Sequence, residues 1–422
     1  MSTPSRPLRV SLDARLASGT SGGVEQFILG LASGLSQLDD GDDEYLFLAW
    51  EDAADWLAPY LGPACRILSD GLRPKPSRST WRRLASRIPL AGRARDEWLP
   101  LLGPLRPNVP TSNGQIERAD VDVMHFTRQS GFLTSVPSVY HPHDLQYLHL
   151  PEYFTRRARA DLEVTYRTLC AQADMVAVAS SWVKRDLVAS YGLSADKIRV
   201  IPLAPPVQAY QQPSEADLRH ARSALDLPED FLLYPAQTWP HKNHLTLLRA
   251  LAFLRQTHGL EIPLVCSGQT TTYLNAIETT AEELGLAERV RFVGFVSPLE
   301  LQCLYRLCRA VIIPTLFEAG SFPMAEAFGM GTAVACSNVT SLPEQAGDAA
   351  LLFDPRDIEQ IAEAVRRLWI DPQLRRTLIA RGHERIRSST WRGTARIFRA
   401  HYRRIAGREL HEEDRELVAA SM

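Results

Sequence analysis

The feature that most constrains this chain is a regular alternation of short apolar runs with segments of helical periodicity. The first run, residues 8–15, leads into a glycine turn, after which Phe27, Ile28 and Leu31 recur at helical spacing. Strand, glycine turn and helix form the opening of a Rossmann-like half. The alternation continues through "VDVMHF", "SVPSVYHP", "ADMVAVASS" and "KIRVIPLAP". It predicts a parallel sheet with helices on both faces.

A second alternating series follows a segment rich in proline and glutamine, residues 202–218, which we interpret as a linker. The later apolar runs are "FLLYPAQ", "IPLVCSG", "RVRFVGFV", "AVIIPTLF" and "TAVACS". One intervening helix is marked by Ser297-Pro298-Leu299-Glu300, a capping box with proline at the first helical position.

Two such halves predict an α/β protein of two Rossmann-like domains, with parallel sheets facing a central cleft. We place the N-terminal domain at 1–205, the C-terminal domain at 206–390, and a C-terminal helix at 391–422. This last helix can pack back on the N-terminal domain, and its charged final dozen residues are expected to be loose.

Composition narrows the functional classes. The formal net charge of −2 over 422 residues gives no general attraction to nucleic acid. None of the six cysteines forms a C-x-x-C pair, so they are interpreted as small core residues rather than a disulfide framework or a zinc site. No secretory signal and no membrane-spanning stretch is recognised, and the protein is expected to be cytoplasmic.

The window at 314–355 is the most informative for chemistry. Glu318 and Glu326 stand eight positions apart, and Pro323 between them predicts the first turn of a helix that includes Glu326. The amides and the dipole at a helix start favour a diphosphate. Two glutamates alone fit better a helix start that is merely stabilised by acidic side chains.

This window resembles the signature of glycosyltransferase family 4, in which E-x7-E precedes an "S-x-x-x-S-L-P-E" segment. The chain has "SNVTSLPEQAGDAALLFDP" there. The resemblance extends to four further blocks in the family's order: "HPHDLQYLHLPEYF" (141–154) and the segments 173–205, 234–251 and 290–315. It implies a GT-B fold and a retaining glycosyltransferase that takes a sugar from a nucleotide-sugar donor.

The resemblance also implies roles for individual residues. Glu326 would hold the ribose, Glu318 would contact the transferred sugar, and Lys242 would neutralise the departing diphosphate. His143 would face the donor sugar, with His141 as the alternative for that role. The other donor-binding residues implied are Ser321 and Phe322 through backbone amides, Val296 at the base pocket, and Gly22 and Gly23 in the first loop.

Two departures from the family pattern limit what is carried over. Glu318-Ala319-Gly320-Ser321 replaces the common E-G-F-G, so sugar specificity is not transferred. Ala236-Gln237-Thr238 replaces a "G-R" turn, which leaves Lys242 as the main cation. No D-x-D motif lies in a loop suited to a metal, and no cofactor or divalent cation is expected. Attack on the same face of the sugar, aided by the departing phosphate, would retain the anomeric configuration.

The expected function is transfer of a hexose, with mannose as the first guess, from a GDP- or UDP-sugar to a glycan or lipid-linked acceptor in surface polysaccharide synthesis. A nucleotide-sugar epimerase and a non-catalytic nucleotide-sugar-binding subunit remain alternatives. A dehydrogenase would need G-x-G-x-x-G after the first strand, and "GTSGGVE" lacks that spacing. Residues 73–95 carry eight basic and no acidic residues before Asp96, which predicts either contact with an anionic membrane face or a solvated loop.

Overall fold

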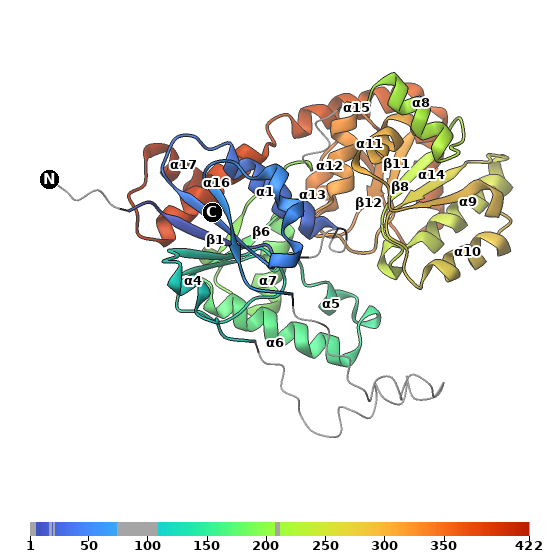
Figure 1. Ribbon diagram of the computed structural model, residues 1–422. Helices are drawn as coiled ribbons and strands as arrows, with labels where there is room; N and C mark the ends of the chain where they lie inside the picture. Colours follow the sequence, from blue (N-terminus) through green and yellow to red (C-terminus); the bar gives the residue numbers. More distant parts are fainter. Residues whose placement is uncertain (1–5, 17–18, 20–21, 74–108, 207–211, 422) are drawn as a thin grey trace. The chain divides into compact units, whose positions relative to one another are not determined.

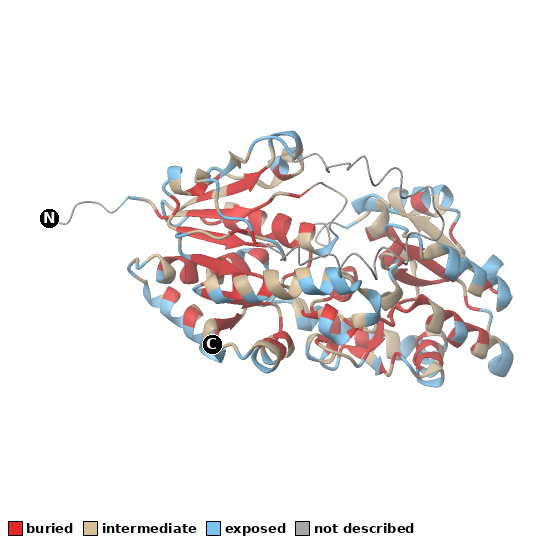
Figure 2. Cartoon of the chain, turned by 90° about the horizontal axis from the view of Figure 1, so that it is seen from below, coloured by how far each residue is buried: buried red, intermediate tan, exposed pale blue. Residues whose placement is uncertain are grey.

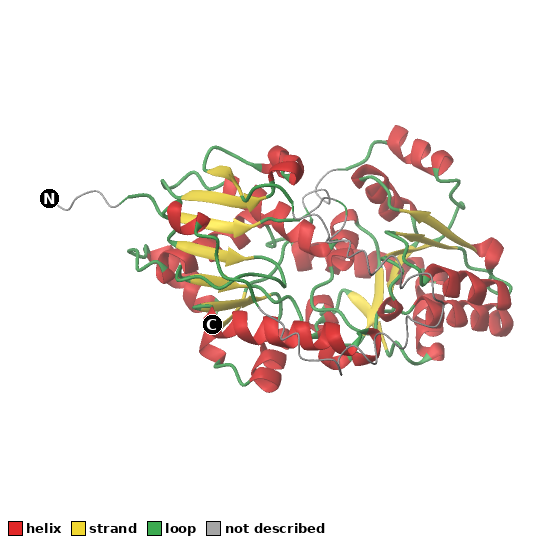
Figure 3. Cartoon of the chain, turned by 60° about the horizontal axis from the view of Figure 1, so that its bottom comes forward, coloured by secondary structure: helices red, strands yellow, loops and turns green. Residues whose placement is uncertain are grey.

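The computed structural model describes residues 6–16, 19, 22–73, 109–206 and 212–421 (Figure 1). The chain divides into two compact units. Unit 1 contains residues 1–178, 184–201 and 395–422, and unit 2 contains residues 179–183 and 202–394. Both units are α/β with parallel strands only, as the alternating pattern predicted, and Figure 3 shows strands and helices within each.

Unit 1 is built on a seven-stranded sheet of order β3-β2-β1-β4-β5-β6-β7. Its strands are β1 (Arg9–Asp13), β2 (Glu44–Ala49), β3 (Cys65–Ser69), β4 (Val123–Phe126), β5 (Ser138–Tyr140), β6 (Met175–Val178) and β7 (Ile198–Val200). Every residue of β4, β5 and β6 is buried, which explains their continuous apolar runs. The order reverses direction between β1 and β4.

Helices cover this sheet, and the chain returns to it at the C-terminus. They are α1 (Gly23–Ser36), α4 (Gln115–Arg118), α5 (Gln146–His149), α6 (Arg156–Gln172), α7 (Ser181–Tyr191), α16 (Trp391–Ile405) and α17 (Glu412–Ala420). In α16, Phe398 and Tyr402 are fully buried, and the Tyr402 hydroxyl lies 2.7 Å from Nδ1 of His125 in β4. The C-terminal segment from Ala395 therefore belongs to the core of unit 1.

Unit 2 carries a six-stranded sheet of order β10-β9-β8-β11-β12-β13. Its strands are β8 (Leu232–Pro235), β9 (Leu264–Ser267), β10 (Val290–Gly294), β11 (Ala310–Ile313), β12 (Val334–Ser337) and β13 (Ala350–Phe353). Its helices are α8 (Glu215–Ala224), α9 (His244–His258), α10 (Leu274–Glu283), α11 (Pro298–Leu307), α12 (Phe322–Met330), α13 (Leu342–Ala346), α14 (Ile358–Ile370) and α15 (Pro372–Ile386). This sheet reverses direction between β8 and β11.

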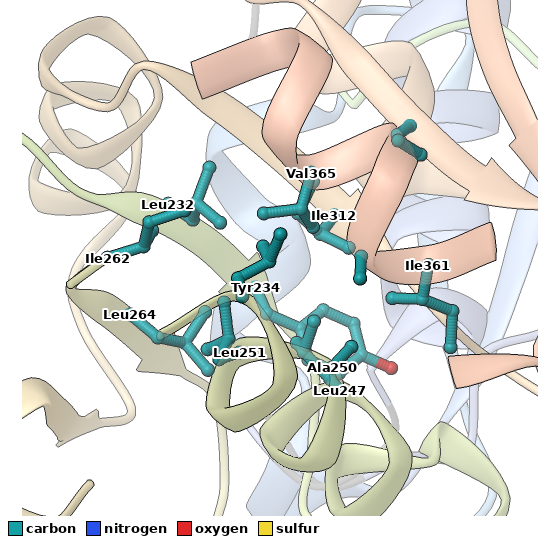
Figure 4. Close-up of a cluster of buried hydrophobic side chains, with 14 of the residues drawn as sticks. Leu232, Tyr234, Leu247, Ala250, Leu251, Ile262, Leu264, Ile312, Ile361 and Val365 are labelled. Carbon is teal, nitrogen blue, oxygen red and sulfur yellow. The ribbon is translucent and has the colours of Figure 1, made fainter. Parts of the chain in front are cut away.

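The two faces of the unit 2 sheet bury separate clusters of side chains. Leu232 and Tyr234 of β8 point to one face, where they pack with residues of α9 and α14 (Figure 4). Leu233 points to the other face and joins a cluster with Phe328 of α12. Alternate side chains of one strand thus bind helices on opposite faces, as the period of a strand requires. Buried residues follow the strands of each sheet in Figure 2.

Short 3-10 helices complete the regular structure. They are η1 (Glu51–Ala53), η2 (Asp55–Tyr60), η4 (Pro151–Tyr153), η5 (Ala195–Lys197), η7 (Pro240–Lys242) and η8 (Ala287–Arg289). The capping box predicted at Ser297 is confirmed, because its hydroxyl and the Glu300 carboxylate bond each other's backbone amides. The cysteines are also as predicted: all six lie in the described part, carry free thiols, and five of them are buried.

Two predictions about local structure were wrong. The final residues are not loose, because α17 is capped at His411, and Asp414 accepts a hydrogen bond of 3.0 Å from buried Arg403. The linker does not extend to residue 218. Ser214 and Asp217 form a capping box that starts α8 at Glu215.

Candidate active site

The reversal of strand order in unit 2 marks its candidate site. In open α/β sheets, ligands bind outside the carboxyl ends of the strands, at the point where the order reverses. In unit 2 this switch point lies between β8 and β11. Lys242 ends the loop that follows β8, and Glu318 lies on the loop that follows β11. Sheet topology thus brings together two residues that are far apart in sequence.

Lys242 and Glu318 form a direct ion pair in this structure. Nζ of Lys242 donates to Oε2 of Glu318 at 2.6 Å, and both side chains are mostly buried. The next residue, Asn243, has a φ of 62° and a buried amide that donates to the carbonyls of Pro314 and Pro355. These bonds fix the start of α9 against the loop after β11, and therefore fix where the lysine side chain begins.

The backbone of Glu318 is held by the segment that follows β12. The Thr340 and Ser341 hydroxyls donate to the Glu318 carbonyl, at 2.6 and 2.7 Å. The Glu318 amide in turn donates to Oγ1 of Thr340 at 3.1 Å. This contact gives the Thr340-Ser341 part of "SNVTSLPEQ" a physical role, which is to orient the loop that carries the glutamate.

Helix α12 starts where the Pro323 signal predicted. Ser321 is its N-cap, and its hydroxyl accepts a hydrogen bond from the Met324 amide. The Ser321 amide already donates to Oε1 of Gln345 at 2.8 Å, so a ligand could use it only by displacing that side chain. The Phe322 amide, at the first helical position, has no acceptor within the helix.

Ser321 and Phe322 also line a cavity of about 290 Å³ in unit 2. Arg385 and Gln345 contribute to the same wall. Lys242, Glu318 and Glu326 are not among its lining residues. The cavity is therefore beside the switch point, and the ion pair does not face into it.

Glu326 lies one turn inside α12 and is partly exposed. The Tyr305 hydroxyl, from α11, donates to its carboxylate. Burial raises the pKa of Glu326 to about 7, although the bond from Tyr305 acts in the opposite direction. Glu326 is thus poised to change its charge near neutral pH. As an anion it can accept hydrogen bonds from hydroxyl groups.

Val296 follows β10 and is half-buried against the hydrophobic cluster around α11 and α12. Its neighbour Phe295 is 70% exposed. Gly294, at the end of β10, makes the turn that leads to these two residues. Its φ is 70°, and its carbonyl accepts a hydrogen bond of 2.7 Å from the Gly268 amide. An apolar surface is available here for a planar base.

Gly22 and Gly23 lie in unit 1 and begin α1. Gly22 is the N-cap, with a φ of 47° that side-chain-bearing residues seldom adopt, and Gly23 is the first helical residue. Both are exposed. Upstream, the Gly19 amide donates to the carboxylate of buried Glu25 at 2.8 Å. The helix start is thus accessible from solvent, as the predicted role requires.

Three histidines stack in the core of unit 1 behind α1. His141 and His143 have ring centroids 4.3 Å apart, and the His125 ring is parallel to that of His141. His141 is only 1% exposed, whereas His143 is partly exposed and its Nε2 lies 2.8 Å from the Thr127 carbonyl. Burial lowers the pKa of His143 to about 4, so the ring is neutral at pH 7. Of the two candidates, His143 is the accessible one.

Sequence reasoning missed several residues that shape these sites. Tyr305 was identified only as part of an apolar stripe, and its hydroxyl is the partner of Glu326. Gln345 gave no signal, because its contact with Ser321 spans 24 positions. Arg15 and Arg128 were also missed. Each follows an apolar run of unit 1, and only the fold places both beside one cavity.

Within the described ranges, no group of three or more His, Cys, Asp or Glu side chains could hold a metal ion. None of the described helices is long and apolar enough to cross a bilayer. The predicted membrane segment 73–95 falls outside the described residues except for Arg73, whose guanidinium lies 5.6 Å from the ring centroid of Trp50.

Several solved structures share this fold. Anabaena HepE in complex with UDP and glucose matches with a TM-score of 0.68 at 18% identity, covering 93% of this chain and 99% of that one. WaaG, a glycosyltransferase involved in lipopolysaccharide biosynthesis, matches with a TM-score of 0.64 at 16% identity, covering 94% and 100%. The predicted fold class is confirmed: two parallel α/β sheets in the GT-B arrangement of glycosyltransferases.

Family models identify the chain more closely. Residues 21–204 match the model described as Glycosyltransferase Family 4, and residues 216–385 match the one described as Glycosyl transferases group 1. Between them, only the two ends and a short junction are left unmatched. The chain belongs to glycosyltransferase family 4.

Curated relatives include several mannosyltransferases. The O-antigen chain mannosyltransferase B of Escherichia coli is 27% identical over 59% of this chain and 65% of its own length. The serotype-specific mannosyltransferase WbdA of the same organism is 27% identical over 54% of this chain and 28% of its own length. The D-inositol 3-phosphate glycosyltransferase of Corynebacterium glutamicum (strain R) is 28% identical over 54% and 58%. The chain thus spans less than two thirds of the length of each of these relatives.

Proposed function

We propose that this chain is a retaining hexosyltransferase that moves mannose from a nucleotide-sugar donor, a GDP- or UDP-sugar, to a glycan or lipid-linked acceptor in surface polysaccharide synthesis. The observation that carries the proposal is the Lys242–Glu318 pair at the switch point of unit 2, beside the start of α12. The choice of mannose is supported by the names of the curated relatives, and a nucleotide donor by the UDP complex of HepE.

Lys242 has the chemistry that the leaving group needs. Departure of a nucleoside diphosphate builds negative charge on phosphate, and a fixed cation stabilises that charge in the transition state. In the structure the Lys242 ammonium is paired with the Glu318 carboxylate. Donor binding would exchange one partner for another: Lys242 moves to the diphosphate, and the Glu318 carboxylate becomes available to sugar hydroxyls.

The other residues complete the donor site in this proposal. The Glu326 anion accepts hydrogen bonds from the ribose hydroxyls. The Phe322 amide donates a hydrogen bond to phosphate, and Val296 packs against the base. The roles of His143 and of the Gly22–Gly23 helix start in unit 1 stay predictions from the family resemblance. No side chain acts as a nucleophile; the acceptor hydroxyl attacks on the face that the phosphate leaves, and the phosphate helps to remove its proton.

The proposal is tested by assaying the full chain with GDP-mannose and UDP-glucose against oligosaccharide and lipid-linked acceptors. NMR of the product gives its anomeric configuration. Retention is expected, and an inverted product would contradict the mechanism. Donor turnover without any acceptor, giving an epimerised sugar, would favour the epimerase. Nucleotide binding with neither reaction would favour a binding subunit.

A chelator tests the expectation that no metal is needed. Since Lys242 is assigned the charge-neutralising role, activity should be the same with and without EDTA. Loss of activity in EDTA that magnesium restores would overturn this part of the proposal.

A further inference from the structure

A second cavity, of about 350 Å³, lies in unit 1. Its lining residues include side chains that follow four neighbouring strands: Arg15 after β1, Trp50 after β2, Asp70 after β3 and Arg128 after β4. The cavity therefore opens at the carboxyl ends of these strands and spans the switch point between β1 and β4. This is the position where open α/β sheets bind their ligands.

The two arginines on either side of this switch point differ in their partners. Arg15 is fully engaged: its guanidinium binds both carboxylate oxygens of Asp13, at 2.8 and 2.9 Å, and Asp70 at 2.9 Å. Asp13 is completely buried. Asp70 also accepts a hydrogen bond of 2.9 Å from the Asn113 amide. Both carboxylates are thus committed to partners other than Arg128.

Arg128 has no direct ion-pair partner among the described residues, although the Asp13 carboxylate acts on it electrostatically. Its guanidinium donates from one nitrogen, Nη1, to the backbone carbonyl of Arg15, and it forms no ion pair with any carboxylate of the described residues. A guanidinium has five N–H donors in a planar fork. Burial lowers the pKa of Arg128 from its ordinary value, with Arg15 acting in the same direction and Asp13 against it. A half-buried cation of this kind gains stability from an anion that enters the cavity.

We propose that the cavity at the β1–β4 switch point binds an anionic group of the sugar acceptor, a phosphate or a carboxylate, with Arg128 as its counter-ion. The Nε and Nη2 side of the guanidinium matches the two oxygens of such a group, as an ammonium could not. The remaining walls suit a sugar ring, since Trp50 and Phe132 are apolar and Asn113 is polar. The assignment of the anion to the sugar acceptor rests on the proposed function. The anion site itself rests only on residues of unit 1.

Calorimetric titration of the full chain at low ionic strength tests the site without any donor. The probes are glucose 6-phosphate, glucuronate and uncharged glucose. At least one anionic probe should bind tenfold or more tightly than glucose, and its binding should weaken with salt. Binding of glucose 6-phosphate alone identifies a phosphate, and binding of glucuronate alone identifies a carboxylate. Equal binding of all three probes, or no binding of either anion, would overturn the proposal.

Variants localise the binding. Arg128→Gln should weaken the anionic probe roughly tenfold to a hundredfold, because a charge-assisted hydrogen bond is lost. Arg128→Lys should fall between this variant and the parent. Arg159→Gln makes the same change at an exposed position of α6 and should have no effect. Equal affinities in Arg128→Gln and Arg159→Gln would contradict the assignment.

The donor site is excluded by a fourth variant. Lys242→Ala removes the cation of unit 2 and should leave binding of the anionic probe unchanged. Loss of that binding in Lys242→Ala would move the anion to unit 2 and overturn the proposal. GDP and UDP are titrated separately, so a failure of nucleotide binding contradicts the proposed function without affecting this result.

Discussion

The two sheets share a topology but arrange charge differently at their switch points. In unit 2, one cation meets one anion: Lys242 from the β8 side binds Glu318 from the β11 side at 2.6 Å. In unit 1, two cations meet: Arg15 after β1 and Arg128 after β4. The carboxylates near them belong to Asp13 and Asp70, and Arg15 binds both.

The same fold can therefore prepare a site in two ways. Lys242 of unit 2 is paired with Glu318, so a diphosphate must compete with that carboxylate. Arg128 of unit 1 makes no direct ion pair with a carboxylate of the described residues, so an anion can bind it without displacing one. The first arrangement favours exchange of partners, and the second favours capture of a group that brings its own charge.

The largest effect is expected where the unit 1 arrangement depends on a buried anion. Burial opposes ionisation of Asp13, but the contacts with Arg15 and the nearby charge of Arg128 together outweigh it and lower the pKa of the carboxyl. Asp13→Asn would leave Arg15 without its buried partner and should lower the free energy of unfolding by about 3–5 kcal/mol. Denaturant unfolding measures this.

The control for this prediction is Asp161→Asn on α6. It removes the exposed ion pair with Arg157 and should change the free energy of unfolding by less than about 1 kcal/mol. If the two variants unfolded at the same denaturant concentration, the buried carboxylate would not be what holds Arg15.

The next effect tests the exchange of partners in unit 2. Lys242→Ala should reduce turnover roughly 100- to 1,000-fold at saturating donor, because the departing diphosphate loses a preorganised cation. Steady-state kinetics with the nucleotide sugar measure this. Lys197→Ala, which changes a partly exposed lysine of unit 1 whose ammonium bonds the Ala171 carbonyl, should turn over like the parent. Unchanged turnover in Lys242→Ala would contradict the role assigned to the paired cation, because that cation would then have no part in leaving-group departure.

A smaller effect separates Glu326 from both charged pairs. Its raised pKa of about 7 means that the acceptor form, the anion, is lost as the pH falls below 7. The association constant for a nucleotide sugar should therefore fall roughly tenfold between pH 8 and pH 6. A nucleotide sugar is the right probe because its diphosphate does not titrate in this range.

The matched variant for this titration is Glu326→Gln, which should bind weakly and with no dependence on pH between 6 and 8. The same carboxyl affects stability. A carboxyl whose pKa is raised in the folded state stabilises the fold at low pH, and this contribution is lost as the pH rises from about 4.5 to about 7. A pH dependence of donor binding that survives in Glu326→Gln would assign the titration to another group.

The sequence allowed prediction of the elements near these sites but not of their mutual contacts. The start of α12 was evident from Pro323, and the α11 cap from Ser297, because caps and prolines act within a few residues. By contrast, α17 was missed because its charged composition suggests disorder, and buried Asp414 is matched only by Arg403 of the preceding helix. Long-range partners carry no local pattern.

The candidate sites show the same limit. Lys242 and Glu318 were found through a family resemblance, and their ion pair could not be foreseen from residues 76 positions apart. Arg128 gave no signal, since a single arginine after a strand is common. Only the strand order, which places β1 beside β4, shows that it shares a cavity with Arg15.

The smallest effect concerns Tyr305, a positioning residue for Glu326. Its hydroxyl donates to the carboxylate, which favours the anion and so lowers the pKa of Glu326 against the effect of burial. Tyr305→Phe should shift the midpoint of the pH dependence of donor binding to higher pH. At pH 7 it should cost about 1 kcal/mol of binding free energy, the usual value of one hydrogen bond. At high pH, where Glu326 is ionised in both proteins, the loss should be smaller.

The control is Tyr140→Phe, which removes a buried hydroxyl that bonds the Gln129 carbonyl in unit 1. It should leave the midpoint in place. A loss of affinity in Tyr305→Phe that is the same at every pH would mean that the tyrosine only packs against α12. A shifted midpoint would mean that it sets the charge of the residue that is proposed to hold the ribose.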